Sequence, residues 1–145
     1  MRLHRLVITG VGPFRDRQEI DFDELADSGL FLIDGATGSG KTTIIDSIVY
    51  ALFGVVSGAD SDPGRMRSNL CGDDDPTGVA CDFSVDGRRH LITRVPAHVR
   101  DPEEPGKAAK SKGARQTLTE YGPDGAELRI LTANREIAEH VHQLL

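Results

Sequence analysis

The strongest constraint on this chain is one eight-residue segment, residues 35–42, which reads GATGSGKT. It matches the phosphate-binding (Walker A) pattern G-x-x-x-x-G-K-[ST] at every fixed position. Glycines allow backbone angles that other residues avoid, so the chain can fold around a phosphate with its N–H groups turned inward. The segment therefore predicts a nucleotide-binding unit in which a strand leads into a loop and the loop into a helix.

The flanking sequence supports this interpretation. Residues 30–33 form the apolar run LFLI, which is typical of a buried strand. After the loop, apolar residues recur at helical spacing and Gly54 can end the helix: Ile44, Ile45, Ile48, Val49, Leu52 and Phe53. This order places the positive end of the helix dipole on the phosphates. A glycine loop that merely joins a strand to a helix is the weaker alternative.

Nine consecutive residues are predicted to bind the nucleotide: Gly35, Ala36, Thr37, Gly38, Ser39, Gly40, Lys41, Thr42 and Thr43. Lys41 is expected to place its charge near the β- and γ-phosphates, and it is the one catalytic candidate. The hydroxyl of Thr42 is expected to bind Mg²⁺. Thr43 is expected to reach a second phosphate oxygen.

Composition limits what else the chain can be. With 145 residues, of which 38% are hydrophobic, one core is expected. The net charge of −6 attracts no nucleic acid, so any DNA contact needs a local basic patch. Cys71 and Cys81 lack the paired spacing of a zinc site or disulfide framework, and we expect them to be reduced. Signal-peptide and bilayer-length apolar patterns are missing from the sequence, which favours a cytoplasmic location and no membrane partner.

The first half of the chain predicts a strand at residues 2–9, a turn at 10–17 and a second strand at 18–22. Residues 55–77 are expected to form an exposed loop with at most one helical turn. Its aspartates lack EF-hand spacing and favour a solvated loop over a metal site: Asp60, Asp62, Asp73, Asp74 and Asp75.

The second half predicts two hairpins and a helix. Apolar and polar residues alternate at 79–85, which predicts a strand, and Asp86-Gly87 predicts a tight turn into a second strand at 89–95. Strands at 116–121 and 126–130 are expected to form the second hairpin. Between them, residues 96–115 are expected to be a flexible loop. Four basic residues in it can either contact a DNA backbone or remain solvated: Lys107, Lys110, Lys112 and Arg115.

The final helix is expected to begin near Thr132 or Asn134, either of which can cap it. Ile137, Val141 and Leu144 then lie on one face, which lacks a predicted partner at the end of the sequence. This pattern predicts a fragment, or the N-terminal part of a longer protein.

Taken together, these segments resemble the N-terminal part of the SbcC family, the ATPase subunits of bacterial SbcCD nucleases in the SMC-like branch of the ABC ATPases. The resemblance covers nearly the whole chain and rests on these motifs: Gly12-Pro13-Phe14, Ile20-Asp21-Phe22, residues 29–33 running into 35–43, Ile45-Asp46-Ser47-Ile48, Arg67-Ser68 and Arg94-Val95-Pro96.

The resemblance implies an α/β (mixed α+β) P-loop NTPase, the first lobe of an ABC-type head, with antiparallel hairpins beside the nucleotide-binding strand and helix. It also implies ATP as the nucleotide, Arg15 as a further nucleotide contact, and a homodimer of heads in the complete protein. The implied partners are an SbcD-like nuclease subunit and DNA, within double-strand-break repair.

Residues 1–145 would be the N-terminal part of that head, before the glutamine loop and coiled coil. The resemblance places the signature motif and Walker B strand later, so this chain alone is expected to be inactive. A small kinase or GTPase and an inactive truncated remnant are the alternatives.

Overall fold

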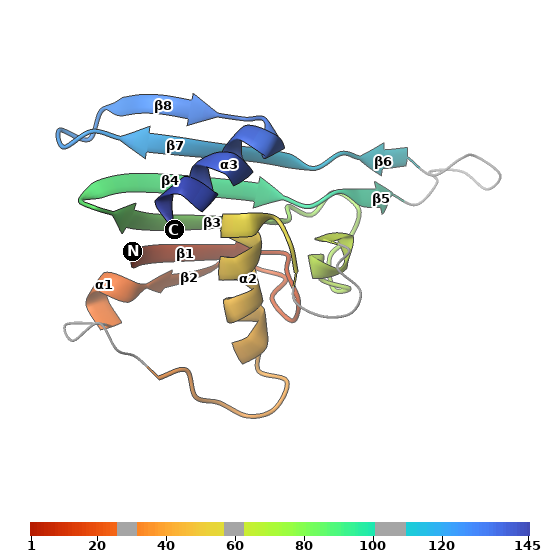
Figure 1. Cartoon of the computed structure of the whole chain (residues 1–145). Helices are drawn as coiled ribbons and strands as arrows, with labels where there is room; N and C mark the ends of the chain where they lie inside the picture. The colour runs from red at the N-terminus through yellow and green to blue at the C-terminus, as the bar shows by residue number, and fades with distance from the viewer. Residues whose placement is uncertain (26–31, 57–62, 101–109) are drawn as a thin grey trace.

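The computed structural model describes residues 1–25, 32–56, 63–100 and 110–145. A six-stranded antiparallel sheet, in the order β2-β1-β3-β4-β7-β8, forms its centre, and helices α2 and α3 lie on one face (Figure 1). The sheet strands are β1 (Arg2–Thr9), β2 (Gln18–Asp21), β3 (Gly78–Val85), β4 (Arg88–Val95), β7 (Arg115–Tyr121) and β8 (Glu127–Leu131). The helices are α1 (Phe22–Leu25), α2 (Lys41–Phe53), α3 (Asn134–Leu144) and the 3₁₀ turn Pro63–Met66. The predicted mixture of antiparallel hairpins beside a helix is confirmed.

Both predicted hairpins are present because their turns carry the residues that tight turns need. At the β3–β4 turn, Asp86 and Gly87 have φ angles of 50° and 78°. Two successive positive φ angles are typical of the turn that matches the twist of paired strands. The register follows directly, with Val85 opposite Arg88 and Val79 opposite Arg94.

The β4–β7 pairing continues outward beyond the sheet. Val95 pairs with Arg115 at its end, and His98 pairs with Lys112 in the short ribbon of β5 (His98–Arg100) and β6 (Lys110–Lys112). The Val95–Arg115 and His98–Lys112 pairs follow the same strand register. The strand pairing is interrupted near Pro96, which has no N–H to donate. The segment expected to be a flexible loop, residues 96–115, thus carries strand structure at both ends, and residues 101–109 lie outside the described residues.

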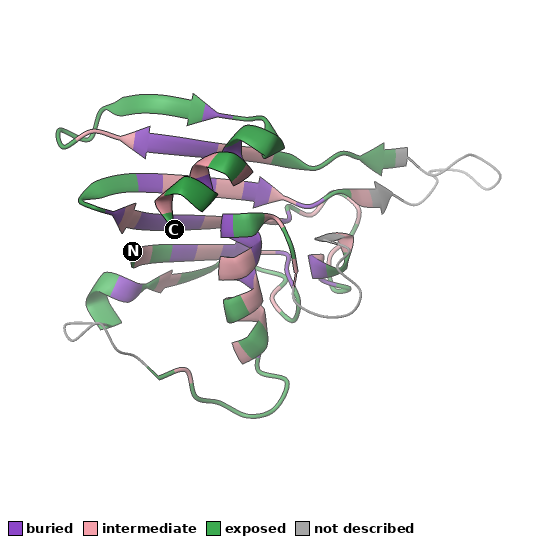
Figure 2. Cartoon of the chain, viewed as in Figure 1, coloured by how far each residue is buried: buried purple, intermediate pink, exposed green. Residues whose placement is uncertain are grey.

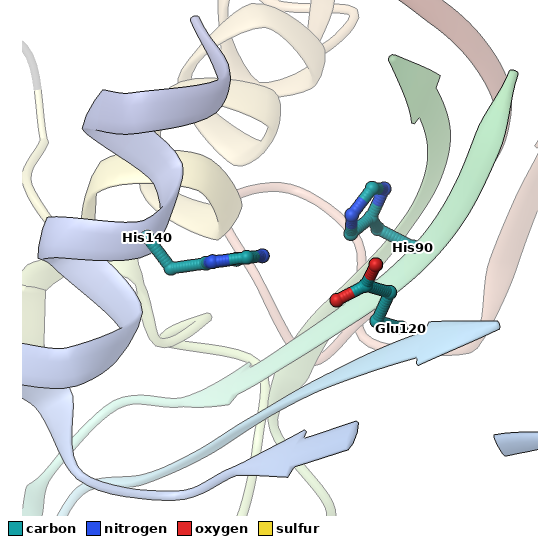
Figure 3. A group of neighbouring side chains, drawn as sticks. All are labelled: His90, Glu120 and His140. Carbon is teal, nitrogen blue, oxygen red and sulfur yellow. The ribbon is translucent and has the colours of Figure 1, made fainter. Parts of the chain in front are cut away.

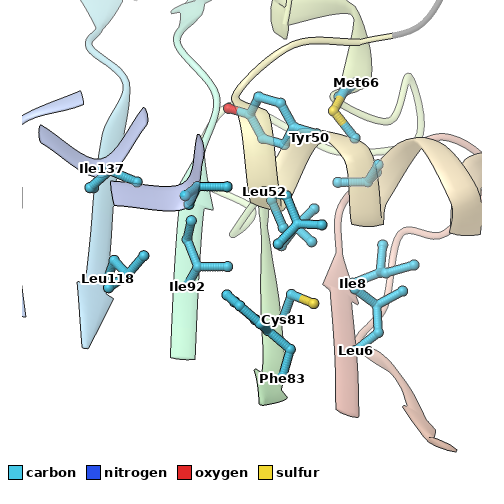
Figure 4. Close-up of a cluster of buried hydrophobic side chains, with 14 of the residues drawn as sticks. Leu6, Ile8, Tyr50, Leu52, Met66, Cys81, Phe83, Ile92, Leu118 and Ile137 are labelled. Carbon is cyan, nitrogen blue, oxygen red and sulfur yellow. The ribbon is translucent and has the colours of Figure 1, made fainter. Parts of the chain in front are cut away.

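A single apolar core lies between the sheet and the two helices, as predicted. Figure 2 shows buried positions concentrated where α2 and α3 contact the central strands. Figure 4 shows the cluster, which includes Leu6, Ile8, Tyr50, Leu52, Met66, Cys81, Phe83, Ile92, Leu118 and Ile137. In the described parts of the chain, no helix is long and apolar enough to cross a bilayer.

The strand expected at residues 30–33 is not seen in its described half. Leu32 and Ile33 have no regular secondary structure and Leu32 is 90% exposed, whereas residues 30 and 31 lie outside the described residues. A strand needs a neighbour for its backbone N–H and C=O groups. The six-stranded sheet pairs no strand with this segment, so an apolar run alone was insufficient evidence for one.

The final helix also differs from its prediction. Its N-cap is Ala133, with no side-chain capping bond, so neither Thr132 nor Asn134 caps it. Asn134 is instead the first helical residue, and its Oδ1 accepts a hydrogen bond from Arg94. The face expected to lack a partner packs within the chain, since Ile137 and Val141 are fully buried.

Arg94 is the polar residue that joins these layers. It is 3% exposed, and its Nε donates to the carbonyl of Ala51 at 2.7 Å, near the C-terminus of α2. Its Nη1 donates to Asn134 Oδ1 at 2.8 Å, at the start of α3. Burial lowers the pKa of the guanidinium, but arginine remains charged at any physiological pH. One strand residue therefore anchors both helices.

Replacing Arg94 with methionine should lower the free energy of unfolding by roughly 2–4 kcal/mol. The substitution leaves the buried Ala51 carbonyl without this donor, at about 1–3 kcal/mol, and removes the hydrogen bond to the exposed Asn134 side chain, at about 0.5–1.5 kcal/mol. Urea unfolding followed by circular dichroism measures the loss. The matched control is Arg135→Met on the exposed side of α3, where Arg135 forms an ion pair with Glu139 worth only about 0.3–0.5 kcal/mol. Equal losses in the two variants would contradict the anchoring role.

The two cysteines should differ sharply in reactivity. Cys81 is fully buried, and burial, followed by the charge of Asp82, raises the pKa of its thiol to about 12. Cys71 is half-buried. Because thiolates are the reactive form, a thiol reagent at neutral pH should modify one cysteine in the folded chain and both in urea. Mass spectrometry should locate the fast modification at Cys71, and rapid labelling of folded Cys81 would argue against this core.

Candidate nucleotide-binding site

The glycine loop ends directly at the N-terminus of α2, the longest helix in the described part of the chain. Gly40 is the N-cap of α2 and has a left-handed φ of 93°. Its carbonyl accepts the first helical hydrogen bond, from the N–H of Ile44 at 3.0 Å. No side chain caps this end, so the cap contributes no competing oxygen to the first-turn N–H donors. Such a terminus suits an anion such as a phosphate.

Lys41 folds back over the loop that precedes it. Its ammonium donates to the carbonyls of Gly35 and Ala36, the latter at 2.8 Å. The N–H of Ser39 also donates to the Ala36 carbonyl, at 3.2 Å, which closes a tight turn. The ammonium is thereby held at the rim of the loop, and it has three N–H donors in all.

The turn between β1 and β2 braces the junction of loop and helix. A methyl group built on Gly40 would lie 2.4 Å from Cζ of Phe14, so the Phe14 ring occupies the space beside that backbone. In the same way, Gly12 approaches Thr43, whose Cγ2 would lie 2.7 Å from a Cβ at Gly12. The sequence alone does not reveal this packing, because only the fold brings Phe14 and Gly40 together.

The predicted nucleotide ligands at residues 35–43 differ in how far the structure exposes them. Residues 35–39 are exposed, Gly40 is buried under Phe14, and Lys41 is half-buried. Thr42, the predicted magnesium ligand, is exposed, whereas the side chain of Thr43 lies against Gly12. The individual roles assigned to these residues stay predictions.

Arg15, the further nucleotide contact expected from the resemblance, forms an ion pair instead. Its Nε donates to Oδ2 of Asp75 at 3.1 Å. The Gly72 N–H on the same carboxylate, together with the charge of Arg15, holds the pKa of Asp75 below its usual value. Exposed pairs of this kind cost little to break, so the predicted role of Arg15 stays open. Asp75 thus acts as an ion-pair partner within the acidic loop, of which Asp60 and Asp62 lie outside the described residues.

Two aspartates, Asp82 and Asp34, follow apolar residues as a Walker B aspartate would, but neither has the setting that this role needs. Asp82 lies on β3 and forms a bidentate ion pair with Arg89, at 2.9 and 2.8 Å. Because Cys81 and Phe83 face the helices, strand alternation puts Asp82 on the opposite face. Asp34 is exposed in the segment that leads into the loop.

Of the basic residues in the segment from 96 to 115, Lys112 contacts two aspartates of the acidic loop. The Lys112 ammonium lies 3.5 Å from Oδ1 of Asp74, and it also approaches the Asp73 carbonyl. Lys107 lies outside the described residues, and contact of this group with DNA stays a prediction.

Comparison with known proteins decides the family. A family model described as an AAA domain matches residues 5–138, which is most of the chain. The chain belongs to the AAA domain family. The AAA domain is a P-loop NTPase fold, so the mixed α/β fold class implied by the family resemblance is confirmed.

Relatives of this AAA domain point to one group of proteins. This chain is 38% identical, over all 145 residues, to the SbcC subunit of the SbcCD nuclease of Vibrio cholerae. The match covers 14% of that subunit. The chain is 37% identical to the protein of the same name in Staphylococcus haemolyticus, over 70% of this chain and 10% of that protein. For Staphylococcus epidermidis the identity is 33%, over 93% of this chain and 13% of that protein. The resemblance to the SbcC family is confirmed, and the chain spans about a seventh or less of these relatives.

Adding a methyl group at Gly40 should destabilise this AAA domain more than the same change at Gly38. Both glycines have positive φ angles, 93° and 84°, which cost alanine about 1–2 kcal/mol. Only Gly40 also meets the Phe14 ring, which adds about 1–3 kcal/mol of overpacking, whereas Gly38 has no atom within 4 Å of the new methyl. Urea unfolding of Gly40→Ala and Gly38→Ala measures the difference. The extra loss of unfolding free energy in Gly40→Ala should shrink when Phe14→Ala is combined with it. Equal losses in Gly40→Ala and Gly38→Ala would refute the bracing role of Phe14.

Proposed function

We propose that this AAA domain binds ATP with Mg²⁺ through residues 35–43. One observation carries the proposal: a complete phosphate-binding loop ends at the uncapped N-terminus of a 13-residue helix. The loop's shape is supported by the left-handed glycines and by the bracing Phe14 ring.

Each group of the loop has a distinct task in this proposal. Backbone N–H groups of the loop and of the first turn of α2 bind phosphate oxygens, where the helix dipole adds positive potential. Lys41 exchanges its bonds with the Gly35 and Ala36 carbonyls for phosphate oxygens and neutralises part of their charge. Thr42, exposed on the first turn, offers its hydroxyl to Mg²⁺. When bound, Mg-ATP supplies the phosphate bond whose cleavage can drive a change of shape.

In the complete protein, we propose, this domain is the N-terminal nucleotide-binding part of a DNA-repair ATPase. Its relatives are named as SbcC subunits of SbcCD nucleases, which supports a cytoplasmic protein whose ATP hydrolysis controls a double-strand-DNA nuclease. Its partners would be an SbcD-like nuclease subunit, DNA reached through the complete complex, and a second head that completes the ATP site. Phosphoryl transfer also needs a group that orients water, which neither Asp82 nor Asp34 supplies.

A small kinase or GTPase is the weaker alternative. Such proteins continue from the phosphate-binding helix into a parallel sheet through β–α–β crossovers. Every strand pair among the described residues is antiparallel, and α2 is followed by hairpins.

Substituting Lys41 with alanine should weaken Mg-ATP binding by about 10- to 100-fold, because a hydrogen bond to a charged group is worth about 1.5–3 kcal/mol. Isothermal titration calorimetry on the folded chain measures the affinity. Lys112→Ala is the matched control, since Lys112 lies on the β5–β6 ribbon and contacts Asp74 rather than the loop. The proposal fails if folded wild type takes up no Mg-ATP, or if Lys41→Ala binds it as tightly as wild type.

The 145-residue chain alone should turn over little ATP, because it supplies phosphate ligands without a water-orienting carboxylate. A phosphate-release assay measures the rate. Robust hydrolysis that disappears in Lys41→Ala would reveal a catalytic carboxylate within these residues and would overturn the half-site interpretation.

A further inference from the structure

Three potential metal ligands from separate elements converge beneath helix α3. His90 lies on β4, Glu120 on β7 and His140 on α3, and one ligand atom from each lies within 4.8 Å of those of the other two. Figure 3 shows the three side chains gathered between the helix and the two strands. We propose that these residues bind a divalent first-row transition metal ion of the Zn²⁺ class. This site is separate from the nucleotide loop.

The backbone already positions two of the three ligands. His90 and Glu120 are directly opposite each other in the β4–β7 register, so their side chains share one face of the sheet. That face is the one covered by α3, which brings His140 over the pair. On the other side, the His90 ring stacks on Phe83, with ring centroids 5.2 Å apart, which restrains its orientation.

The spacing is close to that of a bound ion. In a tetrahedral site with bonds of about 2.1 Å, ligand atoms lie about 3.4 Å apart. The ligand atoms of the three residues lie up to 4.8 Å apart. Each would need to move toward the centre of the group by less than about 1 Å, which small side-chain rotations provide.

The burial and bonding of the histidines point to a ligand. His90 is 0% exposed, yet neither of its ring nitrogens makes a hydrogen bond of normal geometry among the described residues, although the ring lies close to the Arg88 backbone. Nε2 of His140 is also buried and lacks a partner within those ranges. Buried polar atoms are normally satisfied, and metal coordination satisfies an imidazole nitrogen.

The donor set selects the class of ion. Two imidazoles and one carboxylate are the ligands that Zn²⁺ and its neighbours take, whereas Mg²⁺ and Ca²⁺ prefer oxygen alone. Glu120 is 7% exposed and accepts a hydrogen bond from Arg88 Nη1 at Oε1, at 3.1 Å. That bond orients the carboxylate as an outer partner does in known sites. Three protein ligands leave a fourth position for water.

A bound ion would cross-link α3 to the middle of the sheet. Arg94, four residues beyond His90 on β4, already holds Asn134 at the start of α3. His140 lies in the second half of the same helix, so the metal would add a second attachment and stabilise the folded chain in proportion to its affinity.

The test uses the full 145-residue chain in a Cys71→Ser background, which removes the accessible thiol as a competing ligand. Chelator-treated protein is titrated with Co²⁺, whose visible absorption reports tetrahedral coordination, and the Co²⁺ is then displaced by Zn²⁺. Calorimetry gives the Zn²⁺ affinity and stoichiometry, and thermal unfolding is recorded with and without Zn²⁺. One ion per chain and a higher unfolding temperature are expected.

Two variants remove ligands, and a third serves as a control. His140→Ala and Glu120→Gln should each weaken Zn²⁺ binding by more than about 100-fold and abolish the tetrahedral Co²⁺ spectrum. His142→Ala, two residues further along α3 on an exposed position, should leave both unchanged. Urea unfolding of the metal-free variants verifies that each is folded. The proposal is overturned if folded wild type binds no stoichiometric Zn²⁺, if binding survives both ligand substitutions, or if His142→Ala weakens it equally.

Discussion

The buried guanidinium of Arg94 is the interaction on which the arrangement of this domain most depends. Helices α2 and α3 are attached to one face of the sheet by apolar side chains, which give little directional control. Arg94 adds direction, because its donors reach the end of α2 and the first residue of α3 from a single strand position. Gly54 leaves room for it, since a methyl group there would lie 2.9 Å from Nη1 of Arg94.

The opposite end of α2 carries the proposed nucleotide site, and different contacts hold it in place. There the Phe14 ring lies against Gly40, and the β1–β2 turn thereby supports the first turn of the helix. A phosphate site needs backbone N–H groups that stay in place when the charge arrives, because donors that are already oriented cost little to reorganise. The helix is thus fixed at both ends, by a buried charge at its C-terminus and by an aromatic ring at its N-terminus.

Much of this architecture could be predicted from sequence, for reasons that differ between elements. The Asp86-Gly87 turn and the alternation in β3 are local signals, and both hairpins formed as expected. The strand at residues 30–33 was predicted from apolar character alone, and its described half lacks a partner strand. The final helix was placed correctly but its cap was not, because Arg94 uses the Asn134 side chain for an attachment between layers.

What the sequence by itself determined is the glycine-rich loop, the helix after it and the paired strands, since each depends on residues close together in the chain. Only the tertiary structure decided that Phe14 braces Gly40, that Arg94 joins two helices, and that His90, Glu120 and His140 meet under α3. The physical reason is the distance along the chain over which each kind of interaction acts. Backbone propensities act over a few residues, whereas these contacts come from strand register and helix packing, which bring distant side chains to the same point.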